Sequence, residues 1–216
     1  MTNHDIAGRI AHDLKAALSP IRTSAYVLRQ GKQLPDATHR ELLEVIERQT
    51  QRLARMIDEA IDWQRVMAGT LVSRSARHDM AILLDLVVGA LPLAPVVTWP
   101  QGAVPPVVGD RHRLEQMLVA LLECSAQRDP IMPPQIEVTS ADGFARISVS
   151  DLGPPVYLDA LTRTPLYDAP DGGLGLGVLL AQAIAQAHQG ELRVHARTGG
   201  GICFECLLPL DASTAA

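Results

Sequence analysis

The chain has 216 residues, enough for two small domains, and 47% of them are hydrophobic, so it can bury apolar cores. Its formal charge of −5 is mild and no long basic block occurs, which argues against nucleic acid as the main partner. The longest apolar stretch, residues 81–97, is interrupted by Asp85, Pro92 and Pro95. We therefore expect no membrane-spanning helix, and the polar N-terminus is not that of a signal peptide.

Residues 4–67 contain few glycines or prolines and show the periodicity of two amphipathic helices, separated by a loop at residues 31–37. The second helix opens with Thr38–Glu41, which fits a capping box. Apolar residues at spacings of three and four form one stripe on each helix: Ile6, Ile10, Leu14, Leu18, Ile21, Ala25 and Leu28 on the first, and Leu42, Ile46, Leu53, Met56, Ile57 and Ala60 on the second.

Two such helices joined by a short loop form an antiparallel hairpin, which buries each stripe on one side only. A second copy would complete a four-helix bundle, so we expect a homodimer.

After Ala68 the pattern changes to short β-like runs interleaved with helices, which predicts a mixed sheet with helices on one face. The fold class is therefore α+β, with a helical hairpin at 1–68 and an α/β layered domain at 69–216. The predicted strands are residues 96–99, 135–139, 145–151, 191–196 and 201–208, and the predicted helices are residues 80–91, 111–127 and 176–187.

The three cysteines do not make a disulfide framework, and their use fits a reducing cytoplasm. Cys203 and Cys206 form a C-x-x-C pattern within an apolar run that reads as a strand. An offset of three along a strand sends two side chains to opposite faces, so we expect core packing there rather than metal or redox chemistry.

His12 lies on the first predicted helix between the stripe residues Ile10 and Leu14. A rotation of about 200° from either neighbour points His12 away from the buried stripe. An exposed neutral imidazole on a rigid helix is an accessible nucleophile, and Asp13 could orient the ring or accept a proton. The alternative is a merely solvated histidine.

The residues around His12 favour the nucleophile. Residues 11–21, Ala-His-Asp-Leu-Lys-Ala-Ala-Leu-Ser-Pro-Ile, resemble the phospho-acceptor box of sensor histidine kinases, in which an acid, Leu, a basic residue and a Pro-containing turn follow the histidine. Pro20 matches the second proline of one branch of the family, whereas Ala17 replaces the first. Residues 47–61 resemble the second dimerisation helix. The resemblance implies that His12 carries a phosphoryl group and passes it to an aspartate of a response-regulator receiver domain.

The same family resemblance bears on phosphatase activity. Members that also dephosphorylate their partner usually carry an amide or hydroxyl residue four positions after the histidine, and this chain has Ala16 there. Because an alanine cannot position a water molecule, the resemblance predicts weak phosphatase activity by that route.

Residues from about 70 to 210 resemble the ATP-binding domain of the same kinases, which shares its α/β sandwich with gyrase-type ATPases. Gly173, Gly175 and Gly177, followed by an apolar helix and His188, match the second glycine box. Glycines permit close backbone approach, and amides at the start of a helix can bind phosphate oxygens. The resemblance implies a nucleotide site on these glycines.

A second match is the strand that ends in Asp151 and Gly153. In the family, the aspartate of an Asp-x-Gly-x-Gly sequence binds the adenine amino group. The second glycine of that sequence is Pro155 here, and a proline stiffens the loop and lacks an N–H group.

The match is poorest on the helix at 111–127. Where the family has an asparagine that holds Mg²⁺, this chain has Cys124, and where it has a lysine, this chain has Gln127. Magnesium prefers hard oxygen ligands, so Cys124 is a poor substitute and no metal ligand is assigned. Glu123 remains as a misaligned candidate, about 100° around the helix.

Two functions follow from these residues. In the first, the protein is an ATP- and Mg²⁺-dependent protein-histidine kinase that phosphorylates His12. In the second, the C-terminal domain is degenerate and the protein relays phosphate through His12 as a phosphotransferase or scaffold, without using ATP or another cofactor. A purely structural hairpin dimer is a third reading, disfavoured because His12 sits within so much of the box.

Overall fold

The computed structural model describes residues 3–30, 34–89, 94–100, 102, 104, 106–165 and 173–211. These residues form two compact units. The first contains the chain up to Asp62 together with Gly173–Gly175. The second contains Trp63–Pro165 together with Leu176–Asp211.

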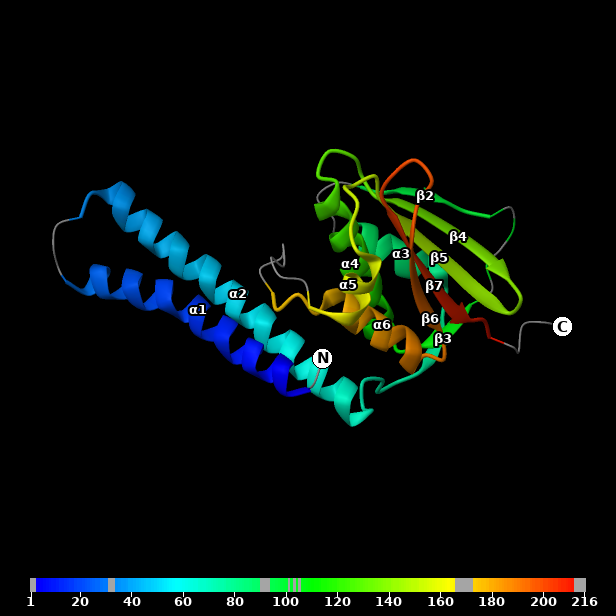
Figure 1. The fold of residues 1–216 in the computed structure, drawn as a ribbon, viewed down its shortest axis with the longest axis horizontal. Helices are drawn as coiled ribbons and strands as arrows, with labels where there is room; N and C mark the ends of the chain where they lie inside the picture. The colour runs from blue at the N-terminus through cyan, green and yellow to red at the C-terminus, as the bar shows by residue number, and fades with distance from the viewer. Residues whose placement is uncertain are drawn as a thin grey trace. The chain divides into compact units, whose positions relative to one another are not determined.

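The first unit is the predicted hairpin, made of helices α1 (Asn3–Arg29) and α2 (Asp36–Ala68, of which residues 63–68 belong to the second unit). The two helices run side by side in opposite directions (Figure 1). Pro20 lies inside α1, which continues to Arg29, so the chain does not turn at this proline. The predicted capping box is wrong, because α2 already begins at Asp36 and Thr38 lies within its first turn.

Few side chains of the hairpin are buried. Ala17 and Met56 are 1% and 0% exposed, whereas the stripe residues Leu18 and Ile57 are 44% and 48% exposed. A single hairpin therefore leaves part of its apolar stripe uncovered.

The second unit has seven strands and four helices among its described residues, besides the end of α2. The strands are β1 (Ala76–His78), β2 (Val96–Thr98), β3 (Val107–Gly109), β4 (Gln135–Ala141), β5 (Phe144–Ser150), β6 (Glu191–Ala196) and β7 (Ile202–Pro209). The helices are α3 (Met80–Val88), α4 (Arg111–Arg128), α5 (Leu158–Arg163) and α6 (Gly177–Ala187).

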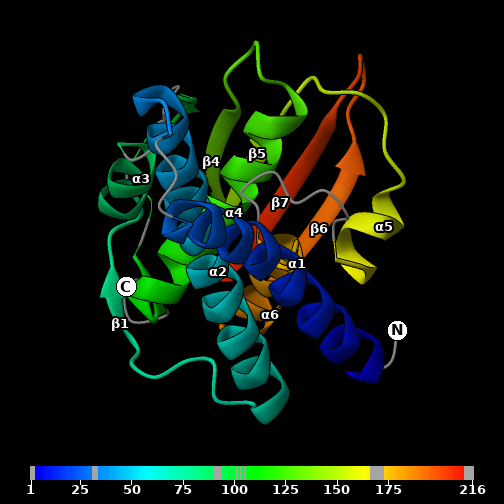
Figure 2. The ribbon, with the colours of Figure 1, turned by 90° about the vertical axis from the view of Figure 1, so that its left-hand side faces the viewer.

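Five strands form one sheet in the order β2-β4-β5-β7-β6, and Figure 2 shows β4, β5, β7 and β6 side by side. The β2–β4 pair is parallel and the other pairs are antiparallel. The predicted mixed sheet is thus confirmed. Strands β1 and β3 form a separate antiparallel pair.

The core of this unit lies between the sheet and helices α4 and α6, which pack against each other. Leu118 and Leu121 of α4 and Phe204 of β7 are at most 1% exposed. On β7, the thiol of Cys206 faces α4 and lies 3.5 Å from Met117 Sδ, whereas Cys203 lines the opposite face of the sheet. The predicted separation of the two cysteines onto opposite faces is confirmed.

All the predicted strands and helices of this unit are present, with small shifts at their ends. The largest shift is in α3, which ends at Val88 with Gly89 as its C-cap, while residues 90–91 lie outside the described residues. The sequence reasoning missed β1, β3 and α5, which have only 3, 3 and 6 residues. No helix among the described residues is long and apolar enough to cross a membrane.

Candidate functional site

His12 projects from α1 into solvent, with 82% of its side chain exposed. Its Nδ1 lies 3.1 Å from Asp13 Oδ1. A neutral imidazole that carries its proton on Nδ1 donates this hydrogen bond and leaves the lone pair on Nε2. The pair therefore presents Nε2 as an open nucleophile.

Asp13 is itself held from the preceding turn of α1. Arg9 Nε lies 3.5 Å from Asp13 Oδ2, and both side chains are 24% exposed. The two oxygens of Asp13 thus face two different partners, which restrains the carboxylate beside the imidazole. Sequence reasoning missed Arg9, although its position one turn before Asp13 could have indicated the contact.

Gly173 and Gly175 belong to the same unit as the hairpin. Between them, the amide of Leu174 donates to Glu59 Oε2 at 2.9 Å, and the carbonyl of Leu174 accepts from Arg9 Nη2 at 3.5 Å. Gly175 has a φ of +74°, a left-handed conformation that favours glycine. The backbone conformation at position 175 therefore favours glycine independently of the match to the glycine box.

Gly177 starts α6 in the second unit. The N-cap residue is Leu176, which has no side-chain acceptor for the first amides of the helix. A Cβ at Gly177 would meet only Ala120 Cβ, at an ordinary 3.6 Å. The start of α6 thus fits a nucleotide phosphate through backbone amides.

Asp151 follows β5 and is buried, with 1% of its side chain exposed. Its Oδ1 accepts from the amide of Gly153 at 2.9 Å, so the structure brings these two predicted residues together. Its Oδ2 accepts from Arg128 Nε at 3.1 Å. Sequence reasoning missed Arg128, because an arginine in the last turn of a helix usually complements the helix dipole in solvent.

His188, the residue that follows α6, has a structural role. Its Nδ1 donates to the carbonyl of Ile184 at 2.8 Å and its Nε2 accepts from the amide of Asp110 at 2.9 Å. A Cβ at Gly109 would lie 2.5 Å from the His188 ring, so glycine is needed there. His188 therefore ties the end of α6 to the start of α4.

Asp110 caps the start of α4 and also holds the loop before β1. Burial by itself would raise the pKa of Asp110, but hydrogen bonds from Ser73, Arg74 and Arg113 outweigh it and lower the pKa to about 2. Asp110 Oδ2 accepts from the Ser73 hydroxyl at 2.9 Å. The carboxylate is thus a structural anion of the folded domain.

The position at which the family holds Mg²⁺ does not fit that metal. Burial raises the pKa of the Cys124 thiol to about 11, so the sulfur is protonated at neutral pH. Gln127 is exposed, and Glu123 occupies the neighbouring position on α4. A protonated thiol is no ligand for a hard cation. The backbone amides at the start of α6 are of the kind that bind phosphate, whereas both oxygens of Asp151 are already engaged and Cys124 does not fit magnesium.

Two family models match this chain. Residues 3–69 match the His Kinase A (phospho-acceptor) domain. Residues 109–212 match the histidine kinase-, DNA gyrase B- and HSP90-like ATPase. Together they cover most of the chain, so the fold and the residues around His12 define a phospho-acceptor hairpin followed by an ATPase-type domain. The chain belongs to the sensor histidine kinase family of two-component systems.

Curated relatives carry the same assignment. The chain is 26% identical over 214 residues to the signal transduction histidine-protein kinase AtoS of Escherichia coli (strain K12), covering 96% of this chain and 35% of AtoS. It is 27% identical over 203 residues to the sensory histidine kinase/phosphatase NtrB of Escherichia coli O157:H7, covering 87% of this chain and 57% of NtrB. The chain thus spans about a third to just over half the length of these relatives.

Solved structures show the same fold. The Acinetobacter baumannii histidine kinase AdeS matches with a TM-score of 0.73 and 19% identity, over 93% of this chain and 98% of the other. Full-length ShkA in complex with AMPPNP matches with a TM-score of 0.67 and 19% identity, over 97% of this chain and 46% of the other. At such identities these likenesses concern the fold alone.

Proposed function

We propose that this protein is a histidine kinase of a two-component phosphorelay, which phosphorylates His12 and passes the phosphoryl group to an aspartate of a receiver domain. The observation that carries the proposal is an imidazole 82% exposed on α1 with its Nδ1 against a carboxylate. The match to the phospho-acceptor family at residues 3–69 supports the role of His12.

ATP, when bound, supplies the γ-phosphoryl group. On the protein side, Nε2 of His12 forms the new N–P bond as the bond from the γ-phosphorus to its bridging oxygen breaks and ADP leaves, and the ring gains positive charge. Asp13 keeps the Nδ1 proton in its hydrogen bond and stabilises that charge, as a carboxylate beside a catalytic imidazole does. In the second transfer the N–P bond breaks, and an oxygen of the receiver's carboxylate takes the phosphoryl group.

The nucleotide-binding roles that we propose rest mainly on the second unit. Backbone amides at the start of α6 bind phosphate oxygens, with Gly177 allowing close approach. Gly173 and Gly175 are proposed as phosphate-binding residues from the glycine-box match alone. Asp151 accepts a hydrogen bond from the base, and Gly153 lets the following loop approach it. No metal ligand is assigned to Cys124 or Glu123.

A specific observation favours a second candidate, phosphotransfer without ATP. The carboxylate of Asp151 is already paired with Arg128, and Cys124 is a protonated thiol at the metal position. In this alternative, His12 accepts its phosphoryl group from one receiver aspartate and returns it to another, and no cofactor is needed.

One experiment tests both functions. The purified chain is incubated with γ-labelled ATP and Mg²⁺, with His12→Gln as the matched control. Acid-labile, base-stable label on the unsubstituted protein alone supports the kinase. If no label appears at saturating ATP on folded protein, the kinase is rejected. Label that then reaches His12 from a phosphorylated receiver domain supports phosphotransfer, and its absence rejects that too.

We also propose that the hairpin dimerises. Leu43, Ile57 and Ile61 of α2 are 48%, 48% and 43% exposed, and a second hairpin would cover such side chains in a four-helix bundle. The change Ile57→Glu should convert a dimer into a monomer in analytical ultracentrifugation, whereas Arg55→Glu, at an exposed polar position of α2, should not. A wild-type monomer at micromolar concentration would contradict the proposal.

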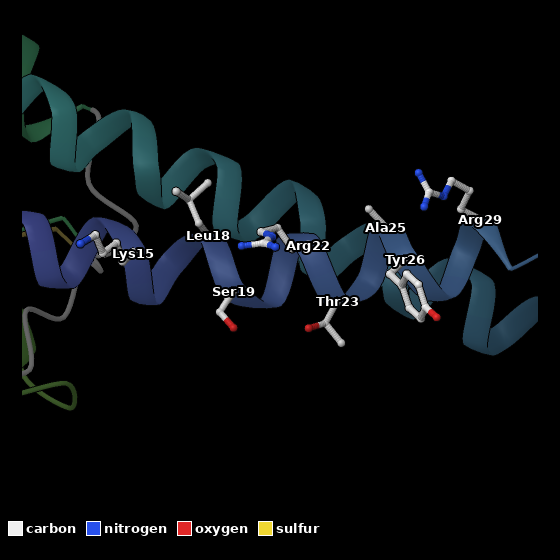
Figure 3. Close-up of a pocket in the computed structure, with 8 residues that line it drawn as sticks. All are labelled: Lys15, Leu18, Ser19, Arg22, Thr23, Ala25, Tyr26 and Arg29. Atoms are coloured by element: carbon white, nitrogen blue, oxygen red, sulfur yellow. The ribbon is translucent and has the colours of Figure 1, made fainter.

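The proposed receiver docks beside His12 on α1. A pocket on this helix is lined by Lys15, Leu18, Ser19, Arg22, Thr23, Ala25, Tyr26 and Arg29 (Figure 3). Lys15, Arg22 and Arg29 recur every seven residues and so follow one face of α1, where they complement an acidic partner surface. Charge reversal at Arg22 should slow transfer to the receiver without changing acceptance of phosphate from ATP.

We also propose that this chain has weak phosphatase activity. Ala16 is exposed one turn after His12, where a phosphatase would need a side chain that positions water. NtrB is named a kinase/phosphatase. We expect this chain, in contrast, to release phosphate slowly from its phosphorylated partner, and we place its activity in the cytoplasm.

A further inference from the structure

The carboxylate of Asp151 is closed off by Arg128. The two side chains are 1% and 13% exposed, and Arg128 Nε donates to Asp151 Oδ2 at 3.1 Å. The other oxygen already accepts the amide of Gly153 at 2.9 Å. In this arrangement both oxygens of Asp151 are engaged and almost none of the side chain is exposed.

Arg128 is also held at a second guanidinium nitrogen. Its Nη2 donates to the carbonyl of Pro154 at 2.6 Å, so one guanidinium bridges the Asp151 side chain and the loop that follows. Such a fork, with donors in two fixed directions, is a property of arginine that lysine does not share.

The loop itself is shaped to receive the end of α4. A Cβ at Gly153 would lie 2.6 Å from the Arg128 carbonyl oxygen and 2.8 Å from Arg128 Cβ. Glycine at 153 therefore has a steric reason that involves Arg128. The pairing is built into the backbone as well as into the side chains.

We propose that Arg128 competes with the nucleotide base for Asp151 and thereby sets both the affinity and the base selectivity of this domain. This inference rests on the proposed function, because it concerns the nucleotide site of that kinase. The amino group at position 6 of adenine would donate to the oxygen that Arg128 Nε now occupies. Hypoxanthine carries a carbonyl oxygen at that position, which places an acceptor against Asp151 instead of a donor, and its only donor on this edge is the neighbouring N1–H.

The size of the effect follows from the fraction of molecules in which Arg128 has released Asp151. If the open form makes up about 1–10% of the population, the apparent affinity is reduced by about 10- to 100-fold. Removing the guanidinium should recover that factor for ATP and little of it for inosine triphosphate.

The test is isothermal titration calorimetry with ATP and with inosine triphosphate, in EDTA, on the full chain. Arg128→Met is the principal variant. Arg111→Met is the matched control, because Arg111 pairs with Glu115 at the other end of α4, at 2.7 Å. We expect Arg128→Met to bind ATP at least about tenfold more tightly than wild type, with a smaller gain for inosine triphosphate, and Arg111→Met to be unchanged.

Two further variants keep the test decisive. If Arg128→Met does not fold, Arg128→Lys keeps the positive charge but loses the fork, and it should still gain affinity for ATP. Adding Asp151→Asn to either variant should cancel the gain. Equal gains for both nucleotides, weaker ATP binding, or no detectable binding by any folded variant would overturn the proposal.

Failure of this inference can be told apart from failure of the proposed function. Acceptance of phosphate by His12 from a phosphorylated receiver does not pass through Arg128. Tighter ATP binding in Arg128→Met without label on His12 would reject the kinase while leaving the competition intact. Label on His12 in wild type, with no change in ATP affinity in Arg128→Met, would support the kinase and reject the competition between Arg128 and the base.

Discussion

The surroundings of His12 and those of Asp151 differ in how an acidic side chain is used. Asp13 is a neighbour of His12 in sequence, and its other partner, Arg9, is one helical turn away. Asp151 is held by Arg128, 23 positions away in sequence, and is nearly inaccessible. The first carboxylate is available to serve a reaction, whereas the second is engaged in holding its own domain together.

Two motifs of one family can therefore contribute differently to function and to stability. Replacing residues around His12 should change phosphoryl transfer and leave stability almost untouched, because surface ion pairs contribute about 0–1 kcal/mol. Replacing Asp151 should change the stability of the second unit as well as its binding of nucleotide.

The largest effect is expected for Asp151→Ala. This change leaves the Arg128 guanidinium buried without its carboxylate, which costs on the order of 3–5 kcal/mol. Urea unfolding of the full chain, followed by circular dichroism, should show a transition shifted to lower urea. The control is Asp13→Ala, for which we expect a change below about 0.5 kcal/mol. Equal losses of unfolding free energy in the two variants would contradict the difference proposed between Asp151 and Asp13.

The same contrast explains what the sequence could predict. The hairpin, the exposure of His12 and the mixed sheet follow from periodicities of 3.6 and 2 residues, which are local properties of the chain. The contact between His12 and Asp13 is local as well. Periodicity does not predict β1 and β3, because three residues are too few to show a period.

The pairing at Asp151 could not be predicted for a different reason. Arg128 stands after Gln127 at the end of a helix, where an arginine is ordinary. Its partner is defined by the close approach of the 151–155 loop to α4, which depends on how the sheet and the helix pack. In the sequence, only Gly153 pointed to this contact, and it did so ambiguously. A glycine permits the close approach of another backbone segment as well as of a ligand, and the sequence does not distinguish the two.

A second prediction concerns pH. The pKa of Asp110 is about 2 in the folded chain, below its usual 3.8, so this carboxylate stabilises the fold above about pH 4. The unfolded chain takes up the proton first as the pH falls, and the stabilisation, on the order of 2 kcal/mol, is lost between about pH 4 and pH 2. Asp110→Asn should thus lower the unfolding free energy at pH 7 and make little difference at pH 2.

The control for Asp110 is Asp142→Asn. Asp142 is exposed and has a φ of 53°, which asparagine also tolerates. This variant should follow the wild-type pH profile throughout. A profile for Asp110→Asn that runs parallel to wild type would show that Asp110 does not hold the loop through its charge.

A third prediction sharpens the role of Asp13. Asp13→Asn keeps the shape of the side chain but removes the charge that stabilises a phosphorylated imidazole. We expect phosphorylation of His12, the step in which the ring gains positive charge, to slow by about tenfold, or about 1.4 kcal/mol in the barrier. Rapid-quench measurement of label arriving on His12 gives the rate, and Asp58→Asn, on an exposed position of α2, is the control. An unchanged rate would show that the charge of Asp13 does not assist the reaction at His12.

The smallest effect is expected at Ser125, which lies directly after Cys124 on α4. It is 0% exposed, and its Oγ has no hydrogen-bond partner among the described residues. A buried hydroxyl without a partner is unfavourable, so Ser125→Ala should raise the unfolding free energy by up to about 1 kcal/mol. Ser73→Ala, which removes a hydroxyl bonded to Asp110 at 2.9 Å, should lower it by about 1 kcal/mol. If Ser125→Ala is destabilising instead, its hydroxyl has a partner in solution, and the interior beside Cys124 is more polar than the packing of α4 implies.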